Sequence, residues 1–275
     1  MQQAGSRVVW SPLSNVILYG GTINPKHLVE AKVPFGLGSD WTPSGSRNLL
    51  LELKVAWPCG QNAGDVPSFR ALAEAATREA ARAAGWDAKL GTLEPGKLAD
   101  VLVLDDRVSD PFENLVRATE REVRLVLIGG QARYGDTEVL QPLGLPTADL
   151  ETLEIGGRAK QLFLKQTGSP LGGCTSAAAR QRLETAMSDL ATLRAQPAVA
   201  FEPLSDEPTI ELELDMQAED ANRGVMPMAD LALLASMPLD PVTVIDDLGY
   251  FDALEAIPHL PAFLKGAGGL RGFYA

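Results

Sequence analysis

A short apolar run that leads directly into glycine, serine and aspartate constrains the fold of this chain more than any other feature. The run covers residues 33–37, and Gly38, Ser39 and Asp40 follow it. Such a run, bounded by turn-forming residues, is typical of a buried strand. With a helix on each side, this strand would form one turn of a parallel α/β fold.

The sequence predicts a helix on both sides of this strand. Asn24 is a typical N-cap, and it opens a helix over residues 25–32 with proline at the first position. Ser46 is the predicted N-cap of a second helix, which continues to Trp57 and stops at Pro58. The order helix, strand, helix therefore favours a parallel sheet.

Asp40 follows the strand at the edge where parallel α/β proteins carry their chemistry. A carboxylate at that edge can hold a divalent metal or take a proton from a bound water. It can equally cap the following loop by accepting backbone N–H groups. An earlier strand over residues 7–10 is predicted to end in a loop at 11–15, which would bring Ser14 and Asn15 to the same edge.

Composition excludes several classes of protein. The chain has 275 residues, 45% of them hydrophobic, and a net charge of −12, which opposes binding to nucleic acid or to an anionic membrane. Cys59 and Cys174 provide neither a disulfide framework nor zinc-ligand spacing. No apolar run is long enough to span a membrane and no signal peptide begins the chain, so we expect a cytoplasmic protein.

Two histidines are very few for an enzyme of this size. His27 falls inside a predicted helix, whereas metal ligands in parallel folds come from strand ends. His259 lies between two apolar residues in a predicted loop, where we expect a surface position. Neither is a predicted ligand.

The order of these motifs resembles the end of the catalytic barrel in the amidohydrolase superfamily. Ser-Pro-Leu-Ser-Asn at 11–15 and Gly-Ser-Asp at 38–40 resemble the segments after the seventh and eighth barrel strands of the branch that holds chlorohydrolases and cytosine- or adenosine-type deaminases. Residues 48–55 are similar to the next helix of that family. Residues 75–85 and 91–105 resemble its terminal helix and the entry into its small β-sandwich.

The resemblance covers residues 7–135 and implies an α/β fold. It implies the C-terminal part of a TIM-barrel amidohydrolase, with the last two barrel strands and helices, followed by a small β-sandwich segment and an α+β extension. The implied domains are residues 1–85 for the end of the barrel, 86–140 for the sandwich segment and 141–275 for the extension.

Local patterns agree with this division. Residues 68–84 form an alanine-rich helix pattern with serine as N-cap, and Gly85 is its predicted stop. Residues 101–104 predict a buried strand, and 123–134 predict a hairpin with a Gly-Gly turn.

The remainder of the chain is less informative. The predictions here are strands at 151–155, 211–216 and 242–245, an amphipathic helix at 176–194, a linker at 196–208, a loop or helix cap at Asp246 and Asp247, and short helical turns at 251–264.

The resemblance implies specific roles for four residues. Asp40 would bind or lie beside a divalent metal, zinc or alternatively iron, and accept a proton from the hydrolytic water. Ser14 and Asn15 would sit at the rim of the substrate pocket, or else bond the backbone as turn residues. Trp41 would form a pocket wall, or pack beneath the loop.

The family's metal-binding histidines, a His-x-His pair and two single residues, have no counterpart in this sequence. Since catalytic zinc sites need about three protein ligands, one carboxylate is not sufficient. We therefore expect a fragment, a truncated reading frame or one half of a split enzyme, without hydrolytic activity of its own. The expected partners are a small-molecule substrate and an N-terminal complementing chain or a homo-oligomer, but neither nucleic acid nor a membrane. The alternative is a non-catalytic accessory chain that packs against another polypeptide.

Overall fold

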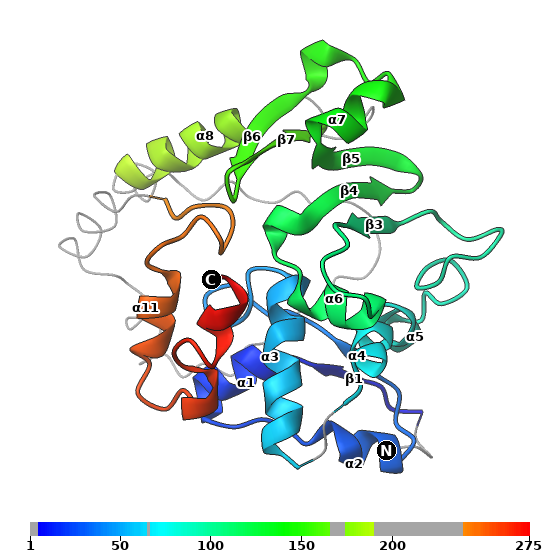
Figure 1. The fold of residues 1–275 in the computed structure, drawn as a ribbon, viewed down its shortest axis with the longest axis vertical. Coiled ribbons are helices and arrows are strands. Elements are labelled where there is room, and N and C mark those ends of the chain that lie inside the picture. Colours follow the sequence, from blue (N-terminus) through cyan, green and yellow to red (C-terminus); the bar gives the residue numbers. More distant parts are fainter. Residues whose placement is uncertain (1–4, 65–66, 166–173, 190–238) are drawn as a thin grey trace, which may run out of the picture. The chain divides into compact units, whose positions relative to one another are not determined.

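A computed structural model describes residues 5–64, 67–165, 174–189 and 239–275. The chain divides into two compact units, Met1–Lys165 with Pro241–Ala275, and Gln166–Asp240. The described residues of the first unit contain a two-stranded sheet, β1-β2, and a five-stranded sheet in the order β3-β4-β5-β7-β6 (Figure 1). The predicted α/β class is confirmed. The domain limits at residues 85 and 140 stay predictions.

The elements of the first unit follow in chain order. They are β1 (Val8–Trp10), α1 (Pro12–Tyr19), α2 (Pro25–Glu30), β2 (Phe35–Leu37), α3 (Leu49–Asn62), α4 (Phe69–Ala76), α5 (Arg78–Ala84), β3 (Val101–Leu104), α6 (Pro111–Arg117), β4 (Val123–Ile128), β5 (Gln131–Asp136), α7 (Thr137–Leu140), β6 (Glu151–Ile155), β7 (Arg158–Leu162) and α11 (Tyr250–Glu255). Single 3₁₀ turns such as η6 (Ala262–Leu264) and η7 (Leu270–Phe273) complete it.

The strands β1 and β2 pair in parallel, as predicted, with Val9 opposite Gly36. Helix α5 packs closely against this pair, because a Cβ atom on Gly36 would lie 2.6 Å from the Cα atom of Ala80. Glycine at this position therefore allows the helix to approach the strand backbone.

The predicted loop over residues 11–15 is wrong, since α1 begins at Pro12. Proline suits the first helical position because its backbone angle is already helical and its missing N–H would have no partner there. Leu13 and Val16 enter the core, and Gly20 ends the helix in the left-handed conformation (φ 71°). Burial of this helical face outweighs the turn-forming residue types.

Helix α3 is also longer and begins later than predicted. Its N-cap is Asn48 and not Ser46, because the Asn48 side chain accepts a hydrogen bond from the Leu51 N–H (2.9 Å). It continues through Pro58 to Asn62. Buried residues precede and follow the proline in this helix, and their packing compensates for the lost backbone hydrogen bond.

The alanine-rich segment is broken at Thr77 into α4 and α5, where a single helix was predicted. The Thr77 hydroxyl donates to the Ala73 carbonyl (2.7 Å), and its backbone leaves the helical region. The predicted ends are confirmed: Ser68 caps α4 by accepting from the Ala71 N–H (3.1 Å), and Gly85 ends α5 with φ 74°.

The Ser68 cap leads to a stability prediction. Ser68→Ala removes the acceptor for a helical N–H and should lower the free energy of unfolding by about 1 kcal/mol. Ser68→Asp keeps an acceptor at the same place and should retain most of the stability. Urea unfolding of the three proteins tests this, and equal midpoints for Ser68→Ala and the unaltered chain would contradict it.

The five-stranded sheet is built from two hairpins and one added strand. Gly129 and Gly130 join β4 to β5 with both residues at positive φ, which confirms the predicted Gly-Gly turn. The prediction that residues 101–104 form a strand is confirmed, but its burial is not. Leu102 and Val103 are 43% and 40% exposed, because β3 is at the edge of the sheet and pairs with β4 alone among the described strands.

The C-terminal segment returns to the first unit (Figure 1, orange and red). The predicted strand at 242–245 is wrong, since these residues form bends and turns. Asp246 accepts from the Gly156 N–H (2.9 Å) and from the Thr243 hydroxyl (2.5 Å), which confirms the predicted role in capping a loop. The short helical turns predicted for 251–264 are confirmed by α11 and η6.

In the second unit, the structure describes α8 (Ser176–Ser188), which confirms the helical prediction as far as Ser188. Thr175 caps it by accepting from the Ala178 N–H (3.0 Å). The predicted linker at 196–208 and strand at 211–216 lie outside the described residues.

The core of the first unit surrounds α3. Apolar side chains of β1, α1, α3, α4 and the C-terminal segment meet there, and they include Trp10, Leu13, Leu51, Val55, Leu72, Leu264 and Leu270. None of the helices in the described ranges is both long and apolar enough to cross a membrane.

Candidate active site

The structure brings together two of the four predicted site residues, Ser14 and Asp40. Ser14 lies in the first turn of α1, which follows β1, and Asp40 lies three residues beyond the end of β2. The Ser14 side chain lies near the Asp40 carboxylate and lowers its pKa. The parallel pairing of β1 and β2 explains this meeting, because it places both carboxyl ends at one edge of the sheet.

Asp40 is exposed and held in an unusual backbone conformation. Its φ of 58° lies in the left-handed region, which non-glycine residues seldom adopt. The Trp41 N–H donates to the Asp40 carboxylate at 2.8 Å. The Ser14 side chain and then the hydrogen bond from Trp41 lower the pKa of Asp40, so that it is ionised at neutral pH. Asp40 thus caps its own loop and still presents an accessible carboxylate.

A third residue of this region, Glu52, is not among the predicted site residues. Its side chain on α3 is fully buried and accepts hydrogen bonds from the Leu13 N–H (2.9 Å) and from the Ser46 hydroxyl. Burial raises the pKa of Glu52 to about 8, with a smaller upward contribution from the charge of Asp40. The one available signal in the sequence is an acidic residue inside the apolar run at 49–55.

Asn15 and Trp41 occupy different surroundings. The Thr22 hydroxyl donates to the Asn15 side-chain oxygen (2.9 Å), and the Trp10 indole N–H donates to Thr22 (2.8 Å). This oxygen of Asn15 is therefore engaged within the fold. Trp41 is 71% exposed, so it does not pack beneath the loop, and a role as a pocket wall stays a prediction.

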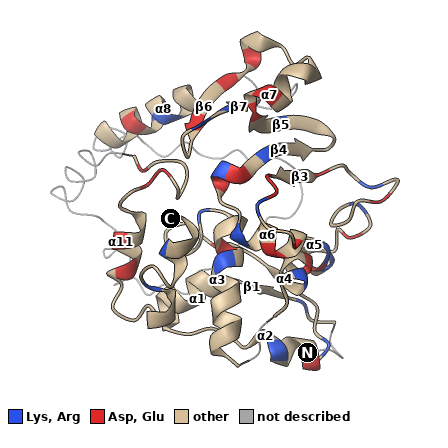
Figure 2. Ribbon diagram, in the orientation of Figure 1, with Lys and Arg blue, Asp and Glu red and all other residues tan. Residues whose placement is uncertain are grey.

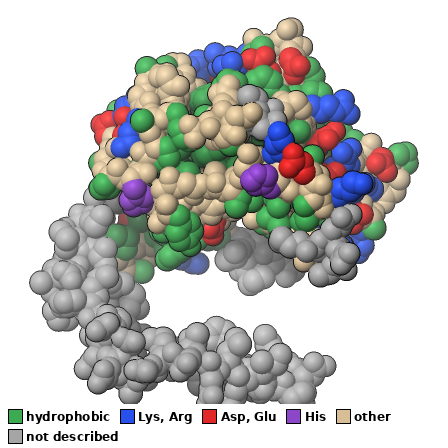
Figure 3. Space-filling model, turned by 90° about the horizontal axis from the view of Figure 1, so that it is seen from below, with side chains coloured by type: hydrophobic (Ala, Val, Ile, Leu, Met, Phe, Trp, Pro, Cys, Tyr) green, Lys and Arg blue, Asp and Glu red, His purple; other side chains and the backbone are tan. Residues whose placement is uncertain are grey.

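The residues at this site do not by themselves fit a catalytic zinc ion. Among the described residues there is no group of three or more His, Cys, Asp or Glu side chains that could hold a metal. Both histidines lie at the surface (Figure 3), and the Nε2 atom of His259 contacts the Ile17 carbonyl. Asp40 can supply one ligand where about three are needed.

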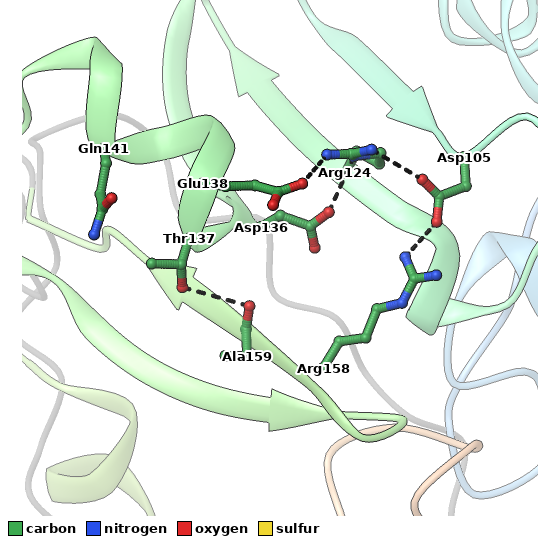
Figure 4. Close-up of a pocket in the computed structure, with 8 residues that line it drawn as sticks. All are labelled: Asp105, Arg124, Asp136, Thr137, Glu138, Gln141, Arg158 and Ala159. Atoms are coloured by element: carbon green, nitrogen blue, oxygen red, sulfur yellow. Dashed lines mark hydrogen bonds and ion pairs between the residues drawn. The ribbon is translucent and has the colours of Figure 1, made fainter.

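A cavity on the five-stranded sheet holds a network of charged side chains (Figure 4). It measures about 540 Å³. Arg124 pairs with Asp105 (3.3 Å), with Asp136 (3.0 Å) and with Glu138, and Arg158 also pairs with Asp105. Acidic and basic residues both occur along the ribbon of this sheet (Figure 2, red and blue). Because each of these acidic side chains pairs with an arginine, we assign this network to the stability of the sheet.

Comparison with known proteins finds similarity over the first half of the chain. Residues 2–133 match the model of the amidohydrolase family. The 5-methylthioadenosine/S-adenosylhomocysteine deaminase of Caldanaerobacter subterraneus is 28% identical over 169 residues, which cover 56% of this chain and 37% of that protein. The guanine deaminase of Escherichia coli is 30% identical over 42% of this chain and 26% of its own length. The solved structure of E. coli guanine deaminase has a TM-score of 0.44 at 25% identity and covers 47% of this chain and 34% of that one.

The two parallel strands carry polar residues at their carboxyl ends. This is the edge at which α/β proteins place their active sites. Residues 2–133, just under half of the chain, are similar to the amidohydrolase family, and the two curated relatives named above are deaminases. The chain spans about a quarter to two fifths of the length of these curated relatives.

Proposed function

We propose that this chain contributes the end of an amidohydrolase barrel to an enzyme that hydrolyses a carbon–nitrogen bond in a small cyclic or amidine-like molecule. In this proposal β1 and β2 are the last two barrel strands, residues 86–140 are a β-sandwich segment and 141–275 are an α+β extension. The observation that carries it is the Ser14–Asp40 pair at the carboxyl edge of two parallel strands. The names of the curated relatives, which are deaminases, support the reaction class.

Asp40 is the proposed proton acceptor. Its carboxylate is ionised and exposed, so it can take a proton from the attacking water and return it to the leaving nitrogen. Ser14 orients the carboxylate, Trp41 forms a pocket wall, and Asn15 lies at the rim. Asp40 would also supply one ligand to a divalent metal, zinc or alternatively iron.

The remaining ligands would come from an N-terminal complementing chain or, as an alternative, from further copies in a homo-oligomer. The described part of the β1-β2 sheet supports this requirement, because two strands leave both outer edges without a strand partner. Val9 on β1 is 65% exposed, as expected for a surface that another polypeptide covers. We therefore propose that the chain does not hydrolyse substrate alone.

A non-catalytic accessory role is the second candidate. The observation that favours it is the incomplete set of metal ligands among the described residues. In that case the sheet edges would still bind another polypeptide, but Asp40 would act only as a loop cap.

Elemental analysis separates these proposals. We expect the purified chain alone to contain no stoichiometric zinc or iron. After assembly with a co-encoded chain that carries a His-x-His pair and further histidines, we expect metal and hydrolysis of amino-heterocycles. Both should be lost in Asp40→Ala and kept in Asp100→Ala, because Asp100 accepts from the Gly129 N–H at a distant hairpin.

Each other outcome has a definite meaning. Stoichiometric metal in the chain alone, lost in Asp40→Ala, would support Asp40 as a ligand but contradict the need for a complementing chain. Assembly that gives metal and hydrolysis unchanged by Asp40→Ala would contradict the catalytic role of Asp40. Assembly without either would favour the accessory role.

A further inference from the structure

We infer that Glu52 is a positioning residue that holds the first turn of α1, which carries Ser14, against the loop that carries Asp40. Its importance for catalysis rests on the role proposed for Asp40. The argument comes from the two segments that the Glu52 carboxyl group joins, one of which carries Ser14 and the other Asp40.

One oxygen of Glu52 holds the first turn of α1. The Leu13 N–H donates to Oε1 at 2.9 Å, and Leu13 directly precedes Ser14. This N–H is one of the groups that a helix leaves unpaired at its start, and the N-cap residue Ser11 makes no side-chain hydrogen bond to the helix. Glu52 therefore supplies the cap of α1 from another helix.

The other oxygen holds the loop that follows Asp40. The Ser46 hydroxyl donates to Oε2, and the Ser46 N–H donates to the Ser39 carbonyl (3.0 Å). The turn between them is tight, since a Cβ atom on Gly45 would lie 2.1 Å from the Ser39 oxygen. A displacement of Ser46 is thus transmitted directly to the residue before Asp40.

Both hydrogen bonds of Glu52 are buried in the core. Glu52 is 0% exposed and Ser46 is 1% exposed, so water cannot replace either hydrogen bond without opening the core. Removal of the carboxyl group would leave the Leu13 N–H and the Ser46 hydroxyl without partners. Both segments would then be free to move apart, and Ser14 would lose its fixed distance to Asp40.

The chain provides a matched control in Glu122. It is 2% exposed and also accepts one backbone N–H and one hydroxyl, both from Thr119 (2.9 and 2.6 Å), and it pairs in addition with Arg107 (3.0 Å). Glu122→Leu should therefore destabilise the fold in a similar way to Glu52→Leu, without acting on the pair. Glu52→Gln keeps a polar group that can bond both partners, because the Ser46 hydroxyl can also accept a hydrogen bond.

The test is NMR of the full chain at one fixed pH. The signals are the Asp40 carboxyl carbon shift, the Trp41 amide proton shift and the hydrogen exchange of the Ser46 amide. We expect Glu52→Leu to move both shifts and to speed the Ser46 exchange by about tenfold or more over Glu122→Leu at matched global stability. Glu52→Gln should restore all three signals. Ser46→Ala removes one of the two hydrogen bonds and should change the three signals in the same direction by less. This variant provides the test even if Glu52→Leu does not fold.

The inference is overturned if Glu52→Leu, or Ser46→Ala in its place, leaves the Asp40 and Trp41 signals where Glu122→Leu leaves them. None of these signals requires metal or substrate. A failure of the proposed function would appear only in metal content and hydrolysis, so the two failures are distinguishable.

Discussion

Replacement of Lys160 by methionine is expected to lower the free energy of unfolding by about 3 kcal/mol. The Lys160 ammonium group is fully buried and donates to the carbonyls of Arg121 (2.9 Å) and Val123 (2.7 Å), while it pairs with Asp136. Its loss leaves buried acceptors without a donor. The cost falls at the low end of the range for broken buried pairs, because Arg124 still pairs with Asp136 (3.0 Å).

Urea unfolding measures this loss. Lys165→Met is the control, because Lys165 is 60% exposed in its side chain and pairs with Asp149 at the surface, where such pairs contribute about 0–1 kcal/mol. A loss of similar size in both variants would contradict the central role of Lys160 in the five-stranded sheet.

The second large effect is a fall and then a rise of stability with pH. Burial raises the pKa of Glu52 from 4.5 to about 8, so the folded state keeps a proton that the unfolded chain releases. The contribution of Glu52 to the free energy of unfolding is fully present below pH 4.5 and is lost as the pH rises to 8. Its size is on the order of 4 kcal/mol.

Lys54, two residues along α3, acts in the opposite direction. Burial lowers the pKa of Lys54 from 10.5 to about 7, although the nearby Glu120 and Glu122 favour the charged form. The folded state therefore gives up a proton more readily than the unfolded chain. The contribution of Lys54 to the free energy of unfolding rises between pH 7 and 10.5, and it is lost as the pH falls through 7. Its size is again on the order of 4 kcal/mol.

Unfolding free energies from pH 4 to 11 test both contributions. Taken together, these two groups give their lowest stability between pH 7 and 8. Glu52→Gln should remove the fall below pH 8, and Lys54→Met should remove the rise above pH 7. A variant curve that runs parallel to that of the unaltered chain would contradict the contribution of that residue.

The meeting of Ser14 and Asp40 could be anticipated, whereas Glu52 could not. Parallel strands in successive helix–strand units share one edge, and this rule brings the ends of β1 and β2 together without further information. Glu52 depends on a hydrogen bond to a residue 39 positions away. The local sequence does not indicate that the acidic side chain of Glu52, inside an apolar helix, will be buried and not exposed.

The sequence by itself determined the features that depend on a few neighbouring residues. The cap at Ser68, the helix stop at Gly85 and the Gly129-Gly130 turn follow from backbone conformation and from hydrogen bonds within three residues. The amidohydrolase resemblance was likewise carried by short motifs in order. These signals act over a short range, so the rest of the fold does not change them.

Only the tertiary structure decided where the helices continue, where they break and where they bury ionisable side chains. Helix α3 passes through Pro58 and buries Glu52 and Lys54, because the energy gained from its apolar neighbours exceeds the local cost. The predicted strand at 242–245 instead forms turns, in which the Thr243 carbonyl accepts a hydrogen bond from Arg47, and Asp246, the residue after this segment, accepts one from Gly156. Packing between distant segments sets these outcomes, since burial is a property of the assembled core and not of any single segment.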